Sequence, residues 1–308
     1  MITLFACPRG FTDEHITLIQ TKAIQSWLLL EPRPQIILLG NEKGIREICQ
    51  EYNIEHIPDI ETSPYGTPLL NSIFQRAAQS AQNDLLAYVN ADIILTQRIY
   101  DAASIIRQKW GNFLIVSAPF IADYDHLTIK TGFEKEISIK KHPIISGADL
   151  FIFPISTYHR IYEDIPKFRI GRLAWDNWLM AKAILNHIPT IDATSYAIIF
   201  HPNYSKSTHI TSVSEIDDRA YFQEEIIFNL AIVTDYYNVI RPEIPYYLDE
   251  EGVIKTRLFG GYTTLWLLQH WKRIKYETAP LRYKLGLYRW WKPAPWREEI
   301  RRRRSQKS

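Results

Sequence analysis

Cysteine is scarce in this sequence. Its 308 residues include only two, Cys7 and Cys49; we expect the first at the end of a strand and the second inside a helix. Two such residues do not build the disulfide framework that is typical of small secreted proteins, and the Cys-x-x-Cys spacing common in zinc and redox sites is absent. The pattern favours a reducing compartment.

Long apolar runs are also missing. No stretch approaches the roughly 20 apolar residues that a membrane-spanning helix needs. The first residues, MITLFACPRGF, lack the charged start and the apolar stretch of a signal peptide. We therefore expect a cytoplasmic protein.

The glycine-based motifs of several enzyme classes do not occur. No G-x-G-x-x-G follows the first predicted strand, and neither G-x-x-x-x-G-K-[ST] nor G-x-S-x-G is present. These absences argue against a Rossmann dehydrogenase, a P-loop nucleotidase and a hydrolase with a nucleophile elbow.

Positive charge gathers at one end of the chain. Residues 271–308 hold 13 Lys and Arg against 3 Glu, while the rest of the chain has 23 basic and 31 acidic residues. The acidic body argues against a nucleic-acid-binding protein. The tail interleaves Trp and Tyr with its cations, which suits the surface of an anionic membrane and predicts a peripheral position on its inner face. A solvated terminus is the alternative.

The first half alternates short apolar runs with segments of helical periodicity. Apolar runs that end at turns are typical of buried parallel strands. Their alternation with helices predicts an α/β fold with an open, mostly parallel sheet and helices on both faces. The expected strands span 2–7, 35–40, 85–90 and 113–118, and the expected helices 15–30, 43–52, 68–80 and 96–109.

The second half is less regular. After a loop or hairpin over about 120–145, we expect a strand at 150–154, a helix at 175–186, a strand at 196–200 and a helix at 215–237. The chain has no internal repeat and no Gly/Ser linker. One domain over 1–250, followed by a basic, aromatic extension over 251–308, is therefore the economical organisation.

Polar residues at the strand ends are the candidate ligand contacts, because ligands of such sheets bind at the carboxyl ends of the strands. Cys7 and Pro8 follow the first strand, and Asn41 follows the second. Asn90 and Asp92 follow the third and point the same way in an extended chain. Asp92 suits Mg²⁺ or Mn²⁺ and Asn90 a ribose hydroxyl; alternatively, Asp92 only caps the next helix.

The segment GRLAWDNW offers a candidate base. Asp176 lies at the start of a predicted helix, where an Asp is by default a first-turn residue stabilised by the helix dipole. Trp175 and Trp178 are by default core residues. Large aromatic side chains around a carboxylate, however, suit a base in a partly dry pocket.

Two further segments carry candidate residues. His201 ends the predicted strand YAIIF, where a metal-ligand role competes with a structural one. In Ser146-Gly147-Ala148-Asp149, the Gly147 backbone can approach a sugar or phosphate and Asp149 can bind a hydroxyl. The same four residues also suit a plain turn.

The order of these features carries more information than any one of them. Asn-x-Asp, Gly-x-Asp, Trp-Asp and a strand-end His resemble the succession of motifs in glycosyltransferases of the GT-A fold. The resemblance covers about residues 2–250. The segments that look like a group of bacterial glycosyltransferase-like proteins (family 2-like) are TLFACPRGF, PQIILLG, GTPLLNSIFQRA, YVNADIIL, DLFIFP and GRLAWDNWL; GTPLLN, VNADIIL and WDNW are the most specific parts.

The resemblance implies a GT-A-like sheet and a role for each matching residue. It assigns Asp92 and His201 to the metal, Asp149 to a sugar hydroxyl and Asp176 as the base. The remaining implied contacts are Cys7, Pro8, Asn41, Asn71 and Asn90 with the nucleotide, and Gly147, Trp175 and Asn177 with substrate. Two departures stand out: residue 90 is Asn where the general motif has Asp, and the segment after His201, PNYSK, is short.

The implied reaction moves a sugar from a nucleotide-diphosphate donor to a hydroxyl acceptor, which is a glycan, a lipid-linked or a small molecule. Mg²⁺ or Mn²⁺ would neutralise the diphosphate, with inversion at the anomeric carbon. A nucleotidyltransferase is one alternative, although its usual Gly- and Lys/Arg-rich loop is reduced here to Cys7-Pro8-Arg9-Gly10. A non-catalytic nucleotide-sugar-binding protein is the other, and the Asn at position 90 keeps it open.

Overall fold

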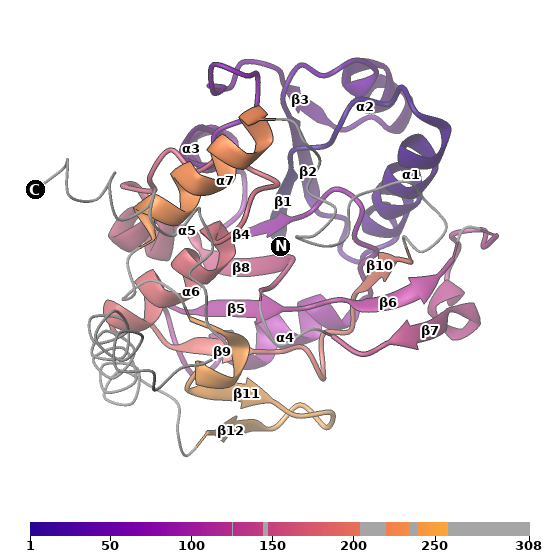
Figure 1. Ribbon diagram of the computed structural model, residues 1–308. Helices are drawn as coiled ribbons and strands as arrows, with labels where there is room; N and C mark the ends of the chain where they lie inside the picture. Colours follow the sequence, from indigo (N-terminus) through magenta and orange to yellow (C-terminus); the bar gives the residue numbers. More distant parts are fainter. Residues whose placement is uncertain (125, 144–146, 204–219, 234–238, 258–308) are drawn as a thin grey trace, which may run out of the picture.

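The computed structural model describes residues 1–124, 126–143, 147–203, 220–233 and 239–257 (Figure 1). Within these residues a nine-stranded sheet runs in the order β3-β2-β1-β4-β8-β5-β9-β11-β12. Its strands are β1 Ile2–Ala6, β2 Gln35–Leu39, β3 Glu55–Ile57, β4 Leu85–Val89, β5 Leu114–Ser117, β8 Leu150–Pro154, β9 Thr190–Asp192, β11 Tyr246–Leu248 and β12 Ile254–Thr256.

Two strands of this sheet run against the others. β8 lies between β4 and β5 and is antiparallel to both, and β12 is antiparallel to β11; the remaining pairs are parallel. The predicted fold class, a mostly parallel α/β sheet, is thereby confirmed. Because β8 is reversed, it begins at the edge where its neighbours end. The residue just before β8 therefore shares the carboxyl edge of the parallel strands.

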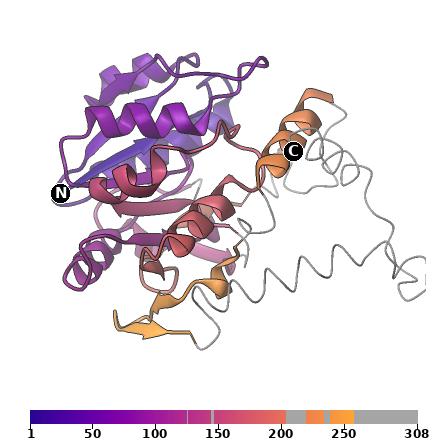
Figure 2. The same cartoon turned by 90° about the vertical axis from the view of Figure 1, so that its left-hand side faces the viewer.

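Helices cover both faces of the sheet (Figures 1 and 2). Their bounds are α1 Glu14–Leu28, α2 Ile45–Tyr52, α3 Leu70–Ser80, α4 Arg98–Arg107, α5 Ile155–Thr157, α6 Trp175–Leu185 and α7 Ala220–Ile232. Side chains alternate between the faces along each strand. In β1, Phe5 packs with the core under α3 and α6, while Leu4 and Ala6 join the core under α1, α2 and α4.

A small second sheet stands at the carboxyl edge. It has the order β10-β6-β7, with β6 Phe120–Asp123, β7 Ser138–Lys141 and β10 Phe200–Pro202. The loop or hairpin expected over 120–145 is largely this β6–β7 pair. Its own apolar core includes Tyr124 and Phe133.

The strand expected at 196–200 is wrong in its bounds. The structure has β10 at Phe200–Pro202, so His201 lies inside a strand and does not follow one. Ala197 and Ile199 are buried. The carbonyl of Ile199 accepts from the N–H of Phe120 in β6 at 2.9 Å, while the two carbonyls before it are bonded by side chains. Ser117 Oγ donates to the carbonyl of Ala197 at 2.9 Å, and Thr96 Oγ1 to that of Ile198 at 2.8 Å.

The C-terminal part is described only in pieces. Of the helix expected at 215–237, α7 accounts for Ala220–Ile232, and the predicted basic tail falls outside the described residues from 258 onward. The strand β12 pairs with β11 in the central sheet. Among the helices that are described, none combines the length and the apolarity needed to cross a bilayer.

Candidate functional site

The carboxyl edge brings the predicted polar residues of β4 and β8 together. β4 ends at Val89, which pairs with Leu150 at the start of antiparallel β8. The flanking residues stay in register, because the backbone N–H of Asn90 donates to the carbonyl of Asp149 at 3.1 Å. Asn90 and Asp149, 59 residues apart in sequence, are therefore neighbours.

A hydrogen-bonded chain links these side chains. The Tyr88 hydroxyl donates to Asn90 Oδ1 at 2.9 Å, and Asn90 Nδ2 donates to Asp149 Oδ1 at 2.8 Å. Asn90 thus uses both ends of its amide. An ionised Asp at position 90 has no N–H to donate and would repel Asp149 at this distance. The departure from Asp-x-Asp therefore has a physical reason in this protein.

The pKa of the Asp149 carboxyl lies closer to neutral pH than that of an ordinary Asp. Burial raises its pKa to about 6, opposed by the nearby His201 and then reinforced by the carboxylates of Asp92 and Asp176. The hydrogen bond from Asn90 lowers the pKa again. A carboxyl with such a pKa exchanges protons near physiological pH, as acid–base groups of enzymes do.

Asp176 lies in the first turn of α6, with backbone donors around its carboxylate. The N–H groups of Ala148, Asn177 and Asp176 itself bond to it. Burial raises the pKa of Asp176, and these three bonds act in the opposite direction. Ala174, just before α6, has a left-handed backbone with φ of 81°. The carboxylate is held by backbone groups of two separate segments.

Gly147 is required where the loop before β8 crosses Asp176. Its φ is 86°, in the left-handed region that favours glycine. A Cβ at this position would lie 2.5 Å from Asp176 Oδ2, well inside van der Waals contact. The loop therefore approaches the carboxylate with bare backbone.

Asp92 and His201 form a second pair at this edge. Asp92 Oδ2 lies 3.6 Å from His201 Nε2, and the two side chains are 22% and 19% exposed. The backbones of Ile94 and Phe200 exchange hydrogen bonds at 2.9 and 3.0 Å, which brings the two segments together. The Tyr124 hydroxyl also donates to the carbonyl of Asp92 at 3.0 Å.

The tautomer of His201 tells what the pair can bind. Its Nδ1 lies 2.9 Å from the carbonyl of Pro202, an acceptor, so Nδ1 carries a proton. In the neutral imidazole, Nε2 then presents a lone pair to the Asp92 carboxylate. Two acceptors facing each other are stabilised by a proton on Nε2 or by a cation, so the donor set fits a divalent ion bound by one carboxylate and one imidazole.

The protein supplies few ligands for such an ion. Over the described residues, no three His, Cys, Asp or Glu side chains are grouped as metal ligands. Mg²⁺ usually keeps several waters and uses one or two carboxylates together with substrate phosphates. A site built here from Asp92 and His201 would depend on the phosphates of its ligand.

The predicted nucleotide contacts lie at the same edge of the sheet. Cys7 and Pro8 follow β1, and burial, reinforced by Glu42, raises the pKa of Cys7 to about 12, so its sulfur is a neutral thiol. Asn41 is exposed after β2. Asn71, in the first turn of α3, has a buried Oδ1 that accepts no hydrogen bond from the described part of the chain.

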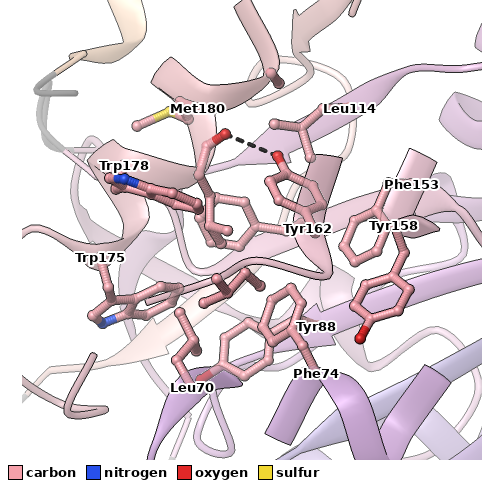
Figure 3. Close-up of a cluster of buried hydrophobic side chains, with 14 of the residues drawn as sticks. Leu70, Phe74, Tyr88, Leu114, Phe153, Tyr158, Tyr162, Trp175, Trp178 and Met180 are labelled. Atoms are coloured by element: carbon pink, nitrogen blue, oxygen red, sulfur yellow. Dashed lines mark hydrogen bonds between the residues drawn. The ribbon is translucent and has the colours of Figure 1, made fainter. Parts of the chain in front are cut away.

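Trp175 and Asn177 are engaged with the protein. Trp175 is 5% exposed, and its ring meets that of Tyr88 edge-on at 5.3 Å (Figure 3). The ring of Phe151 lies 5.6 Å from that of Trp175. Asn177 Nδ2 donates to the carbonyl of Val239 at 2.7 Å. Both positions indicate structural roles, and direct substrate contact stays a prediction.

Several residues of the site were not predicted from the sequence. Tyr88 lies in a run of apolar strand residues, so the sequence did not indicate that its hydroxyl orients Asn90. The N–H of Ala148 carried no signal, because backbone donors are not visible in residue types. Glu225 of α7 pairs with Arg172 at 2.7 Å although 53 residues separate them.

Glu225 fixes the segment that leads into Asp176. Its side chain is 2% exposed and accepts from both Nε and Nη2 of Arg172, at 3.1 and 2.7 Å. Ser63 and Thr67 donate to the same carboxylate. Asn229, one helical turn later, bonds to the backbone of Arg169 through N–H and C=O, at 2.9 Å each. α7 therefore ties residues 169–173 to the loop before α3.

Comparisons with known proteins give likenesses to solved structures. No protein-family model matches the chain, and no curated protein does. TarS of S. aureus in complex with UDP-GlcNAc is 12% identical, with a TM-score of 0.46; the likeness covers 75% of this chain and 65% of that one. The mannosyltransferase PcManGT of Pyrobaculum calidifontis, in complex with GDP-Man and Mn²⁺, is 10% identical with a TM-score of 0.43, covering 75% and 61%. A cytidylyltransferase of Leptospira borgpetersenii is 13% identical with a TM-score of 0.36, covering 63% and 75%.

Proposed function

We propose that this protein is a glycosyltransferase that takes a sugar from a nucleotide-diphosphate donor. The observation that carries the proposal is the convergence of Asp92, Asp149, Asp176 and His201 at the carboxyl edge of a mostly parallel sheet. Ligands of open α/β sheets bind at that edge. Three carboxyl groups with one imidazole match the need of a reaction that expels a diphosphate and removes a proton.

The diphosphate of the donor would lie beside Asp92 and His201. These two side chains would hold Mg²⁺ or Mn²⁺ together with the phosphate oxygens, and the bound ion would supply Lewis-acid stabilisation of the leaving group. Asn71 would accept a hydrogen bond from the nucleotide through its buried Oδ1. Cys7, Pro8 and Asn41 line the neighbouring strand ends, and Asn90 is close by.

Asp176 would act as the base. In the reaction, the acceptor oxygen bonds to the anomeric carbon, the bond from that carbon to the β-phosphate oxygen breaks, and the acceptor proton moves to Asp176. Burial raises the pKa of Asp176, which makes its carboxylate a better proton acceptor. Asp149 would hydrogen-bond a sugar hydroxyl. A direct displacement of this kind inverts the anomeric centre; a product that keeps the donor's anomeric configuration would contradict this part.

A thermal-shift screen tests donor binding. The wild-type protein is heated with UDP-, GDP-, CMP- and dTDP-sugars, each with and without Mn²⁺, starting from UDP-GlcNAc and GDP-Man. A ligand at 100 times its dissociation constant stabilises a fold by about 2.7 kcal/mol. We expect one nucleotide class to raise the melting temperature in a Mn²⁺-dependent way, and Asp92→Ala to lose that increase.

Asp101→Ala is the matched control. Asp101 is an exposed residue of α4 and is none of the proposed donor or metal contacts, so its variant should respond like the wild type. Stabilisation that persists in Asp92→Ala contradicts the metal assignment. No stabilisation by any donor contradicts the proposed function.

A further inference from the structure

A second feature of the carboxyl edge is a cavity of about 630 Å³ beyond the end of β9. Its volume is in the range of small-molecule sites, which is about 300–1,000 Å³. The polar residues that line it are Arg98, His142, Thr194, Ser195, Arg241 and Glu250. The lining thus includes two arginines and a histidine against one glutamate. None of these residues takes part in the donor site proposed above.

Arg98 is the first residue of α4. Its guanidinium lies 5.0 Å from the centroid of the Tyr196 ring and 3.5 Å from the carbonyl of Glu250. Neither contact neutralises its charge, and no carboxylate in the described residues lies within ion-pair distance of it. The aromatic ring and the carbonyl hold the cation at the cavity.

Arg241 is positioned on another side of the cavity. It is 8% exposed, donates to Thr194 Oγ1 at 2.9 Å and lies 3.5 Å from Asp192 Oδ2. The same carboxylate oxygen also receives Arg257 at 2.8 Å. Asp192 is therefore divided between two guanidinium groups, and Arg241 is oriented by groups on β9 and the loop after it.

The cavity lies two strands along the sheet from Asp149, the proposed contact of a sugar hydroxyl. Asp149 N–H donates to the carbonyl of Ser117 on β5, and the N–H of the next residue, Ala118, donates to Thr194 Oγ1 after β9, at 3.1 and 3.0 Å. Neighbouring strands are about 4.8 Å apart. The step from β8 across β5 to β9 is thus about 10 Å, a distance that one sugar-sized acceptor spans.

We propose that this cavity binds an anionic group, a phosphate or a carboxylate, carried by the acceptor. That the anion belongs to an acceptor rests on the proposed glycosyltransferase function, whereas the anion site itself is inferred from the cavity alone. Arginine binds both groups through paired N–H donors. The exposed Ser195 can add a hydroxyl donor, whereas the Thr194 hydroxyl donates to Asp192 Oδ1 at 2.6 Å and serves to position Arg241. Glu250 would limit the site to anions that reach both arginines.

Ligand-observed saturation-transfer NMR tests the anion site. The probes are glycerol 3-phosphate and glucuronate, with glycerol and glucose as their neutral counterparts, titrated in EDTA so that no metal at Asp92 attracts the anion. We expect the two anions to bind the wild type and the neutral compounds not to bind. Arg98→Gln should weaken anion binding about tenfold, since it removes a charge-assisted hydrogen bond.

Arg107→Gln is the matched control. Arg107 is on the same helix, is exposed, and pairs with Asp84 at 3.0 Å outside the cavity, so its variant should bind the anions like the wild type. Equal anion binding by Arg98→Gln and the wild type, equal binding of neutral and anionic probes, or no binding of either anion overturns the inference.

A nucleotide-sugar titration on the same preparation separates this inference from the proposed function. If the donor binds and the anions do not, the anion site is wrong and the glycosyltransferase proposal stands. If the anions bind through Arg98 and no donor binds, the cavity is an anion site and its assignment to an acceptor is wrong. The phosphate and carboxylate arms of the NMR titration tell which of the two groups the acceptor carries.

Discussion

Replacing Gly147 with alanine tests how the Asp176 carboxylate is held. The new Cβ would lie 2.5 Å from Asp176 Oδ2, at a φ of 86°. Two costs follow. The left-handed backbone opposes any residue with a Cβ, and the methyl group occupies the space that the carboxylate now fills.

The two costs differ in size and in what they affect. A left-handed residue other than glycine costs about 1–2 kcal/mol in the free energy of unfolding. Relief of the contact requires a shift of about 1 Å, either of the carboxylate or of the loop that donates the Ala148 N–H. A displacement of that size at a reacting group lowers a rate by about 100-fold.

Gly132→Ala separates the two costs. Gly132 has a φ of 83°, close to that of Gly147, but a Cβ there meets no atom within 4 Å. Both variants are unfolded in urea and then assayed for release of the nucleoside diphosphate from the donor. We expect both to lose about 1–2 kcal/mol, and only Gly147→Ala to lose about 100-fold in rate.

Two results would refute this reasoning. Equal rates for Gly147→Ala and Gly132→Ala, each corrected for the folded fraction, would mean that the position of Asp176 does not matter to the reaction. A Gly147→Ala protein as stable as the wild type would mean that the loop does not adopt the left-handed backbone on which the argument rests.

Three further predictions concern stability and reactivity. The pKa of Asp149 is raised to about 6 by burial, against about 3.9 when unfolded, so the free energy of unfolding should fall by about 2–3 kcal/mol from pH 4 to pH 7. Asp149→Asn should remove this fall in urea titrations across pH; an unchanged pH profile contradicts it. Glu225→Gln should cost about 3 kcal/mol or more, because a buried guanidinium loses its carboxylate, while the exposed neighbour Glu224→Gln should cost under about 1 kcal/mol; similar losses would refute a buried ion pair. Burial raises the pKa of Cys7 and Cys49 to about 12, so neither thiol should react with a disulfide reagent at pH 8 until urea is added; rapid labelling of the native protein would contradict this.

The long apolar strands and the helices between them could be predicted from the sequence. β1, β2, β4, β5 and β8 each have four or five residues with a continuous buried run, which is enough for an apolar pattern to stand out. β3, β9, β11 and β12 have three residues each. Three residues are too few for a pattern, and the partners of β9, which are β5 and β11, are distant in sequence.

The strand assigned to YAIIF shows the limit of apolar periodicity. Ala197 and Ile199 are buried as a strand's residues would be. The segment is irregular up to Ile199, because side chains of Ser117 and Thr96, and no strand, satisfy the carbonyls of Ala197 and Ile198. Apolar burial alone does not distinguish a strand from a loop whose backbone is bonded in this way.

The composition of the candidate site was accessible where a residue follows a strand. Asn90 and Asp92 were predicted because they follow a strand, Asp149 because it ends the Ser-Gly-Ala-Asp segment before the next strand, and Asp176 because it begins a helix between two tryptophans. The Tyr88 hydroxyl and the Ala148 N–H were not, since their roles arise from register and loop geometry. Glu225 needed a long-range contact that no local pattern indicates.

The most direct test of the central claim is the rate of nucleoside diphosphate release from the donor that the thermal-shift screen identifies, for the wild type and Asp176→Asn. We expect the wild type to release the diphosphate, and Asp176→Asn to be slower by about 10²–10⁴-fold, with its affinity for the donor unchanged. Equal rates for the two proteins, or a wild type that binds the donor but never cleaves it, would contradict the assignment of Asp176 as the base of a glycosyltransferase.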